Sequence, residues 1–268
     1  MARLVRIPLF MSVAARWLSH EPRARTGARL ALATVALWAR GRGLPLGGRP
    51  FVVTATTANG TPVRFRVWDY IDMLVAREIF LDRDYRVPED LEPATIADLG
   101  ANVGIAVRFL AAQYPAAEIV AAEPDPRNAA RLRANVAGLG RVRVVEAAVA
   151  PEHGRAAFSL AAEGWASALG DENEDPHIEV DCVTLDELLD GEAVDLLKLD
   201  IEGGEWPLLE AGALQATSDC IVGEAHFDER HDEGALRAQL TGFDVTIHRA
   251  GDDVASFTAT RISSRPRG

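Results

Sequence analysis

A glycine-rich stretch between a predicted strand and a predicted helix is the feature of this sequence best suited to chemistry. Residues 98–104 read DLGANVG and follow the β-rich run 95–99. Glycine lets a backbone approach a ligand without an intervening Cβ, and the first turn of the helix after it offers unpaired N–H donors. The candidate ligand-binding residues of this stretch are Asp98, Gly100, Ala101, Asn102 and Gly104.

A carboxylate at the end of the next predicted strand strengthens this interpretation. Glu123 follows the run 118–122 and stands 19 positions after Gly104. At such a place a carboxylate can accept hydrogen bonds from both hydroxyls of a ribose. Each feature alone has a structural explanation, a chain reversal or a solvated strand end, but the two together favour a nucleoside site.

The spacing of the glycines narrows the choice of nucleoside. A dinucleotide site needs the pattern G-x-G-x-x-G, whereas Asn102 and Ile105 stand where its second and third glycines would be. No phosphate-binding G-x-x-x-x-G-K-[ST] motif occurs. A cofactor with a ribose and no pyrophosphate fits these residues, which points toward S-adenosylmethionine. An NAD-dependent oxidoreductase is the less favoured alternative.

Three acids and a histidine lie at the ends of the fourth and fifth predicted parallel strands, 195–199 and 220–225. Asp200 and Glu202 follow the fourth strand, and Glu224 and His226 lie at the end of the fifth. Methyl transfer to an alcohol needs positioning and the removal of a proton. His226 is the first candidate for the base because its unperturbed pKa is near neutrality. A structural role at the strand end is an equally favoured interpretation of this histidine.

The same side chains have a second use, as metal ligands. Asp200, Glu224 and His226 form an oxygen and nitrogen set that could hold a divalent ion and lower the pKa of a chelated hydroxyl. No sequence signature supports this set, so metal-free base catalysis is the favoured hypothesis.

The elements that must position these residues alternate between strands and helices from residue 95 onward. This alternation predicts right-handed crossovers and a parallel sheet with helices on both faces. The runs 243–249 and 254–261 predict a closing antiparallel pair. The runs 155–160 and 178–184 are predicted as strands on either side of a loop that holds Trp165 and Ser167. This loop could close over a cofactor or cap the sheet.

The part before this alternation has a different pattern. Two amphipathic helices within residues 1–48, a hairpin at Asn59-Gly60 and a helix over 70–81 are expected there. We therefore expect an α/β protein with an N-terminal part, 1–90, and a Rossmann-like domain, 91–268. The N-terminal helices are interpreted first as a packing or dimerisation arm, and otherwise as a lid or a membrane-touching surface.

Several separated segments resemble, in order, the FkbM-type methyltransferases. They cover roughly residues 79–226 and are DLGANVG at 98–104, Glu123-Pro124, Ala148-Val149, TLDEL at 184–188 and LKLDIEGGE at 197–205. The resemblance implies a class I methyltransferase sheet with S-adenosylmethionine across the carboxyl ends of its strands. Asp98 and the 100–104 loop would then face the methionine half of the cofactor.

The resemblance also implies roles for residues at the ends of the other strands. Glu123 would hold the ribose, and Glu146 and Ala147 are candidates for the adenine edge. Pro124 and Asp200 complete the candidate cofactor-binding set.

Composition sets limits on partners and location. The chain has 268 residues, a net charge of −12 and a pI near 5.0, which disfavours nucleic acid as a partner. Cys182 and Cys220 form no disulfide framework or zinc motif, which fits a cytoplasmic protein. The apolar stretches are too short to cross a bilayer.

The expected function is therefore S-adenosylmethionine-dependent O-methyl transfer to a hydroxyl of a small molecule or sugar. A homodimer through the N-terminal arm is one expected assembly. A non-catalytic nucleoside-binding partner subunit is the alternative from another class of protein.

Overall fold

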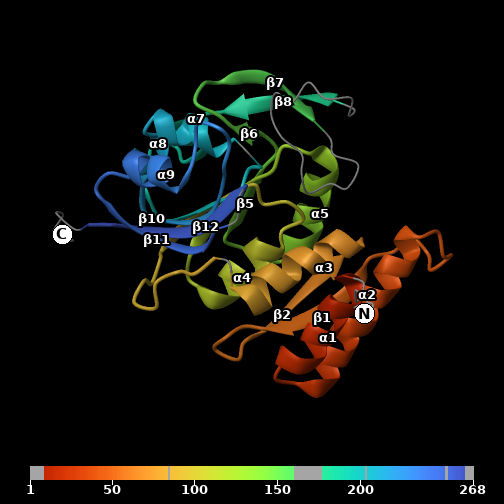
Figure 1. Cartoon of the computed structure of the whole chain (residues 1–268). Coiled ribbons are helices and arrows are strands. Elements are labelled where there is room, and N and C mark those ends of the chain that lie inside the picture. The colour runs from red at the N-terminus through yellow and green to blue at the C-terminus, as the bar shows by residue number, and fades with distance from the viewer. Residues whose placement is uncertain (1–8, 84, 160–176, 203, 251–252, 263–268) are drawn as a thin grey trace, which may run out of the picture. The chain divides into compact units, whose positions relative to one another are not determined.

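The computed structural model describes residues 9–83, 85–159, 177–202, 204–250 and 253–262 (Figure 1). Trp165 and Ser167, in the loop considered as a cover for the cofactor, lie outside these residues. The chain divides into two compact units. Unit 1 comprises residues 1–83 with 108–113, and unit 2 comprises residues 84–107 and 114–268. Among the described residues, no helix has both the length and the apolar character needed to cross a bilayer.

Unit 1 contains the two helices and the hairpin that the sequence predicts. The predicted helix over 70–81 changes to a π-helical turn after Arg77. Asp69 caps α3 through its side chain, which accepts a hydrogen bond from the backbone of Asp72. The elements are α1 (Leu9–His20), α2 (Ala24–Gly41), β1 (Phe51–Thr56), β2 (Pro62–Val67), α3 (Tyr70–Arg77) and η1 (Glu78–Asp82).

Helices α1 and α2 pack closely against each other. Trp17 of α1 and Leu30 and Leu37 of α2 are fully buried. A Cβ at Gly27 would lie 2.5 Å from the carbonyl oxygen of Trp17, so glycine is what allows the two helix backbones to approach here. At the other end of the pair, the rings of Phe10 and Trp38 stack with centroids 3.9 Å apart.

Unit 2 is built around a seven-stranded sheet in the order β11-β12-β10-β9-β3-β4-β5. Strands β5, β4, β3, β9 and β10 run parallel, and β12 lies antiparallel between β10 and β11. The seven strands are β3 (Thr95–Leu99), β4 (Glu118–Ala122), β5 (Val142–Val145), β9 (Val194–Leu199), β10 (Ser218–His226), β11 (Phe243–Ala250) and β12 (Val254–Arg261).

The strand order reverses between β3 and β9. Right-handed crossovers that move outward in opposite directions from this point place their helices on opposite faces of the sheet. Figure 1 accordingly shows α7, α8 and α9 together on one side of the sheet. The helices of this unit are α4 (Ile105–Gln113, shared with unit 1), α5 (Pro126–Val136), α6 (Leu185–Leu188), α7 (Glu205–Glu210), α8 (Ala213–Thr217) and α9 (Glu233–Gln239).

The expected α/β fold with a class I methyltransferase sheet and a final antiparallel pair is confirmed by this topology. A further small sheet has the order β6-β8-β7. It consists of β6 (Ala148–Val149), β7 (Gly154–Ser159) and β8 (His177–Val183). Its strands β7 and β8 confirm the strands predicted over 155–160 and 178–184, whereas β6 and the pairing of the three strands are not indicated by the sequence. With only two residues, β6 is too short to show a periodic pattern.

The close contact at Gly27 leads to a stability prediction for unit 1. We expect Gly27→Ala to lower the free energy of unfolding by about 1–3 kcal/mol, because the new methyl group would overlap backbone atoms that cannot move independently. Gly41→Ala in the same helix is the matched control, since a Cβ there meets nothing within 4 Å. Urea denaturation followed by circular dichroism measures both, and equal stability of the two variants would contradict the packing argument.

Candidate cofactor and acceptor site

The turn between β3 and α4 is shaped by two glycines with left-handed backbone conformations. Gly100 has φ 77° and Gly104 has φ 83°. A Cβ at Gly100 would lie 1.8 Å from the carbonyl oxygen of Asp200, so only glycine lets the ends of β3 and β9 come together. Asn102 also has a left-handed φ of 48°, a conformation that asparagine tolerates better than most residues. These three positions delay the start of α4 to Ile105.

A pocket opens at this point, where the strand order reverses. It encloses about 650 Å³ of space free of atoms, part of it open to solvent. Ligands in open α/β sheets bind at the carboxyl ends of the strands at such a reversal. Seven residues proposed from the sequence line this pocket: Gly100, Asn102, Glu123, Pro124, Ala147, Asp200 and Glu202.

The other lining residues are ones that the sequence analysis did not propose as ligand-binding. They are Ala122, Asn128, Ala148, Val149, Phe158, Ile201 and Gly204. Ala148 and Val149 carry part of the family resemblance, which is the one signal that could have found them. Phe158 lies in a predicted strand, 155–160, but nothing in the sequence indicates that it lines the pocket, because the pairing of this strand in the small sheet depends on the tertiary structure.

Glu123 is held at the mouth of the glycine turn. Its carboxylate accepts hydrogen bonds from the backbone N–H of Asn102 at 2.8 Å and of Asp125 at 2.9 Å. The residue is 5% exposed, and burial raises the pKa of the carboxyl to about 7, although the two hydrogen bonds oppose the shift. Glu123 therefore lines the pocket with a carboxyl group that gains or loses its proton near neutral pH.

Some predicted residues lie elsewhere. Ala101 and Gly104 do not line the pocket, and a Cβ at Gly104 would lie 2.5 Å from Leu132 of α5. Glu146, proposed for the adenine edge, forms an ion pair with Arg133 at 2.6 Å on the surface. The next residue, Ala147, lines the pocket instead, because the side chains of successive residues point in opposite directions at the end of a strand.

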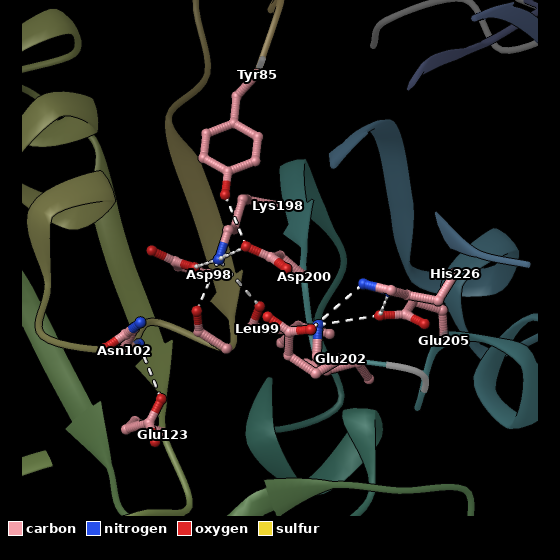
Figure 2. A network of polar contacts seen from close by, with 12 residues as sticks. Tyr85, Asp98, Leu99, Asn102, Glu123, Lys198, Asp200, Glu202, Glu205 and His226 are labelled. Atoms are coloured by element: carbon pink, nitrogen blue, oxygen red, sulfur yellow. Dashed lines mark hydrogen bonds and ion pairs between the residues drawn. The ribbon is translucent and has the colours of Figure 1, made fainter. Parts of the chain in front are cut away.

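Asp98 is fully buried beneath the turn and pairs with Lys198 of β9. The Lys198 ammonium lies 3.1 Å from the Asp98 carboxylate and donates a hydrogen bond to the Gly100 carbonyl at 2.7 Å. Burial raises the pKa of Asp98, which the lysine opposes, and burial opposes a rise in the Lys198 pKa that the surrounding carboxylates produce. Figure 2 shows Asp98, Asp200 and Tyr85 pointing toward this ammonium group.

Tyr85 is a site residue that the sequence analysis missed. Its hydroxyl donates a hydrogen bond to the Asp200 carboxylate at 2.8 Å, across 115 positions of sequence (Figure 2). Burial, together with the negative charge of Asp200, raises the tyrosine pKa well above its ordinary value, so the hydroxyl keeps its proton. Asp200 lies 3.6 Å from Lys198 as well.

His226 lies between two glutamates. Its Nε2 is 3.3 Å from Glu202 and its Nδ1 is 3.3 Å from Glu205, which is fully buried at the start of α7 (Figure 2). Burial alone would lower the pKa of this histidine, but the bonds to and charges of both glutamates raise it to about 11. His226 is therefore an imidazolium cation at neutral pH.

Glu202 is the member of this cluster that lines the pocket, and it has a left-handed φ of 53°. Burial raises the pKa of its carboxyl, while the hydrogen bond to His226 lowers it. Glu224, at the end of β10, does not line the pocket.

The three residues considered as metal ligands do not form a ligand set. Asp200 accepts the tyrosine hydrogen bond and His226 uses both ring nitrogens on glutamates. Within the described parts of the chain, no group of three His, Cys, Asp or Glu side chains is arranged to hold a metal ion.

These features define a class of protein, the Rossmann-like proteins that bind a nucleoside at the reversal of a parallel sheet. The family model for the methyltransferase FkbM domain matches residues 98–253, more than half of the chain. The chain belongs to this family of S-adenosylmethionine-dependent methyltransferases, in agreement with the resemblance seen in the sequence. The alternative of an NAD-dependent oxidoreductase is not supported.

Two curated relatives are each similar to about half of this chain. The 2-O-methyltransferase NoeI of Sinorhizobium fredii is 29% identical over 161 residues, which cover 53% of this chain and 66% of the relative. Methyltransferase 1 of Beauveria bassiana is 28% identical over 162 residues, 50% of this chain and 65% of the relative. The chain thus spans just under two thirds of the length of these relatives.

A similar solved structure is the precorrin-6y C5,15-methyltransferase of Geobacter metallireducens. It is 19% identical, with a TM-score of 0.39, and the match covers 67% of this chain and 85% of that one.

The raised pKa of Glu123 predicts that the binding of S-adenosylhomocysteine, the product of the cofactor, depends on pH. A ribose donates two hydrogen bonds to an ionised carboxylate, whereas the protonated acid offers fewer acceptor sites. Since the folded chain keeps this proton up to pH near 7, we expect the Kd for S-adenosylhomocysteine to fall by about 10-fold between pH 6 and pH 8. Isothermal calorimetry measures it. Glu123→Gln is the control, with weaker binding that no longer changes over this range, and a constant wild-type Kd would refute the assignment.

The buried pair of Lys198 and Asp98 predicts a coupled effect on stability. Lys198→Met leaves a buried carboxylate uncompensated, and we expect the free energy of unfolding to fall by about 3–5 kcal/mol. Adding Asp98→Asn removes that charge and should restore part of the loss in urea denaturation. Arg141→Met, which breaks the exposed pair with Glu118, should cost less than about 1 kcal/mol. Additive effects of the two buried substitutions would show that the pair is not coupled.

Proposed function

We propose that this protein transfers a methyl group from S-adenosylmethionine to a hydroxyl oxygen of a small molecule or sugar. The observation that carries the proposal is the position of Glu202 and Asp200, which line the same pocket as Glu123. Asp200 and Glu202, which could accept a proton, thus line the same pocket as Glu123, which could hold a ribose. The name of the relative NoeI, a 2-O-methyltransferase, supports oxygen as the acceptor atom.

The residues of the pocket fit the proposed cofactor. Glu123 accepts the ribose hydroxyls, and Ala147, Val149 and Phe158 offer an apolar wall for the adenine ring. Gly100 and Asn102 line the pocket beside the β3 turn, where the amino-acid end of the cofactor would lie. When bound, S-adenosylmethionine supplies an electrophilic methyl group on a sulfonium.

Glu202 is our candidate for the general base in place of His226. An imidazolium with a pKa of about 11 has no free lone pair at neutral pH, so His226 cannot accept the proton of the acceptor hydroxyl. Burial raises the pKa of the Glu202 carboxyl, which makes its carboxylate a better proton acceptor. His226 holds Glu202 in place by the ion pair at 3.3 Å. Asp200, fixed by Tyr85, orients the acceptor.

The test is turnover by the purified chain on a panel of acceptors. The panel includes monosaccharides with free hydroxyls, phenols and serine peptides, with transfer of a labelled methyl group as the readout. We expect Glu202→Gln to lower kcat by about 10²–10⁴-fold while the Kd for S-adenosylhomocysteine stays unchanged. Glu210→Gln is the matched control, because Glu210 lies exposed in α7 and pairs with His231.

Two outcomes would count against the proposal. Full activity of Glu202→Gln would remove this residue from the reaction. Binding of S-adenosylhomocysteine without methyl transfer to any acceptor would favour the alternative, a non-catalytic nucleoside-binding subunit.

A further inference from the structure

Charge is divided very unevenly along this chain. Residues 1–68 contain eleven arginines and a single acidic residue, Glu21, for a net charge of +10. The remaining 200 residues carry a net charge of −22, so that the whole chain has −12. Glu21 is itself buried, and its carboxylate accepts hydrogen bonds from the backbone and hydroxyl of Thr56. The surface of the first 68 residues is therefore free of exposed acidic side chains.

The same segment carries exposed apolar side chains. Eight of the nine large apolar residues that are exposed in the described part of the chain lie between residues 9 and 52. On α1, Met11 and Leu18 are 49% and 58% exposed, and on α2, Leu32 and Val35 are 70% and 41% exposed. Soluble domains rarely gather such side chains without a partner for them.

These residues follow the helical repeat and form stripes. Met11 and Leu18 are seven positions apart, which is two turns of a helix, so they share one side of α1. On α2 the exposed side runs from Arg25 and Arg29 to Leu32, with spacings of four and three. We call these five residues the outer stripes of α1 and α2, two helices that pack side by side in unit 1 (Figure 1).

The arginines of the outer stripes are available to a partner. Arg25 and Arg29 are exposed and form no ion pair with the described acidic residues. Arg16, by contrast, pairs with Asp82 inside unit 1. A helix that presents leucines beside unpaired arginines has the composition of one that lies in a membrane interface.

We propose that the outer stripes of α1 and α2 dock unit 1 onto the surface of an anionic lipid bilayer. The leucines and Met11 enter the boundary of the acyl chains, and Arg25 and Arg29 contact the negatively charged headgroups. A nucleic acid would neutralise the arginines but leave the leucines in water. A two-fold dimer through the same stripes would leave Arg25 and Arg29 without an anionic partner, because the stripes contain no acidic residue.

The test is cosedimentation of the full chain with lipid vesicles. We expect binding to phosphatidylcholine vesicles that contain about 30 mol% phosphatidylserine, little binding to pure phosphatidylcholine, and weaker binding in about 0.5 M NaCl. Arg25→Gln with Arg29→Gln should weaken partition by roughly 30-fold. Leu18→Glu with Leu32→Glu should weaken it by at least about 10-fold, because two apolar groups are lost from the interface.

Matched controls separate docking from folding. Ile262→Glu changes an exposed apolar residue of unit 2, and Arg141→Gln changes an exposed arginine there, so both should bind vesicles like the wild type. The docking variants should keep the wild-type circular dichroism spectrum and urea denaturation midpoint, which shows that the helices of unit 1 are folded. They should also keep the wild-type affinity for S-adenosylhomocysteine, which shows that unit 2 is folded.

Four results would overturn the proposal. They are no binding to anionic vesicles, equal binding to neutral ones, unchanged binding of both docking variants, or self-association that the Leu18→Glu and Leu32→Glu variant abolishes while vesicles are not bound. Binding of a DNA duplex in place of vesicles would assign the surface to nucleic acid instead.

Discussion

The ammonium group of Lys198 lies in the centre of the sheet, where the ends of β3 and β9 meet, and it is almost completely withdrawn from water. A charge in such a place is stable only with opposite charge and hydrogen-bond acceptors around it. Asp98 supplies the charge and the Gly100 carbonyl supplies an acceptor. The lysine thus ties the base of the glycine turn to the neighbouring strand, and the pocket wall depends on that connection.

A second group of paired charges lies around Glu202, which lines the pocket. His226 is held as a cation by Glu202 and Glu205, and the buried Glu205 also accepts a hydrogen bond from the backbone of Ile201. The loop after β9 is therefore fixed at both ends, by Lys198 below and by Glu205 beside it. Because each ionised group has a partner, a carboxylate can remain ionised although it is partly buried, and its charge would favour a positively charged cofactor.

The division of charge between the segments of the chain follows a different logic. The pocket and its surroundings are acidic, which suits a cationic methyl donor, whereas residues 1–68 are basic and expose leucines. The acidic pocket does not require a basic N-terminal segment, and the basic segment does not require an acidic pocket. A net charge for the whole chain hides this division, and the composition argument against polyanionic partners therefore applies to the catalytic part and not to the first 68 residues.

The sequence by itself determined the strand, turn and helix around residues 98–104, the carboxylate of Glu123 and the family, because glycine conformation, hydrophobic period and motif order are local properties. Tertiary structure alone decided which distant side chains meet. Tyr85 reaches Asp200 across 115 positions, and Phe158 lines the pocket from a predicted strand whose place in the small sheet the sequence does not indicate. The positive charge of His226 could not be predicted from the sequence either, since its pKa depends on burial and on neighbours that only the folded chain brings together.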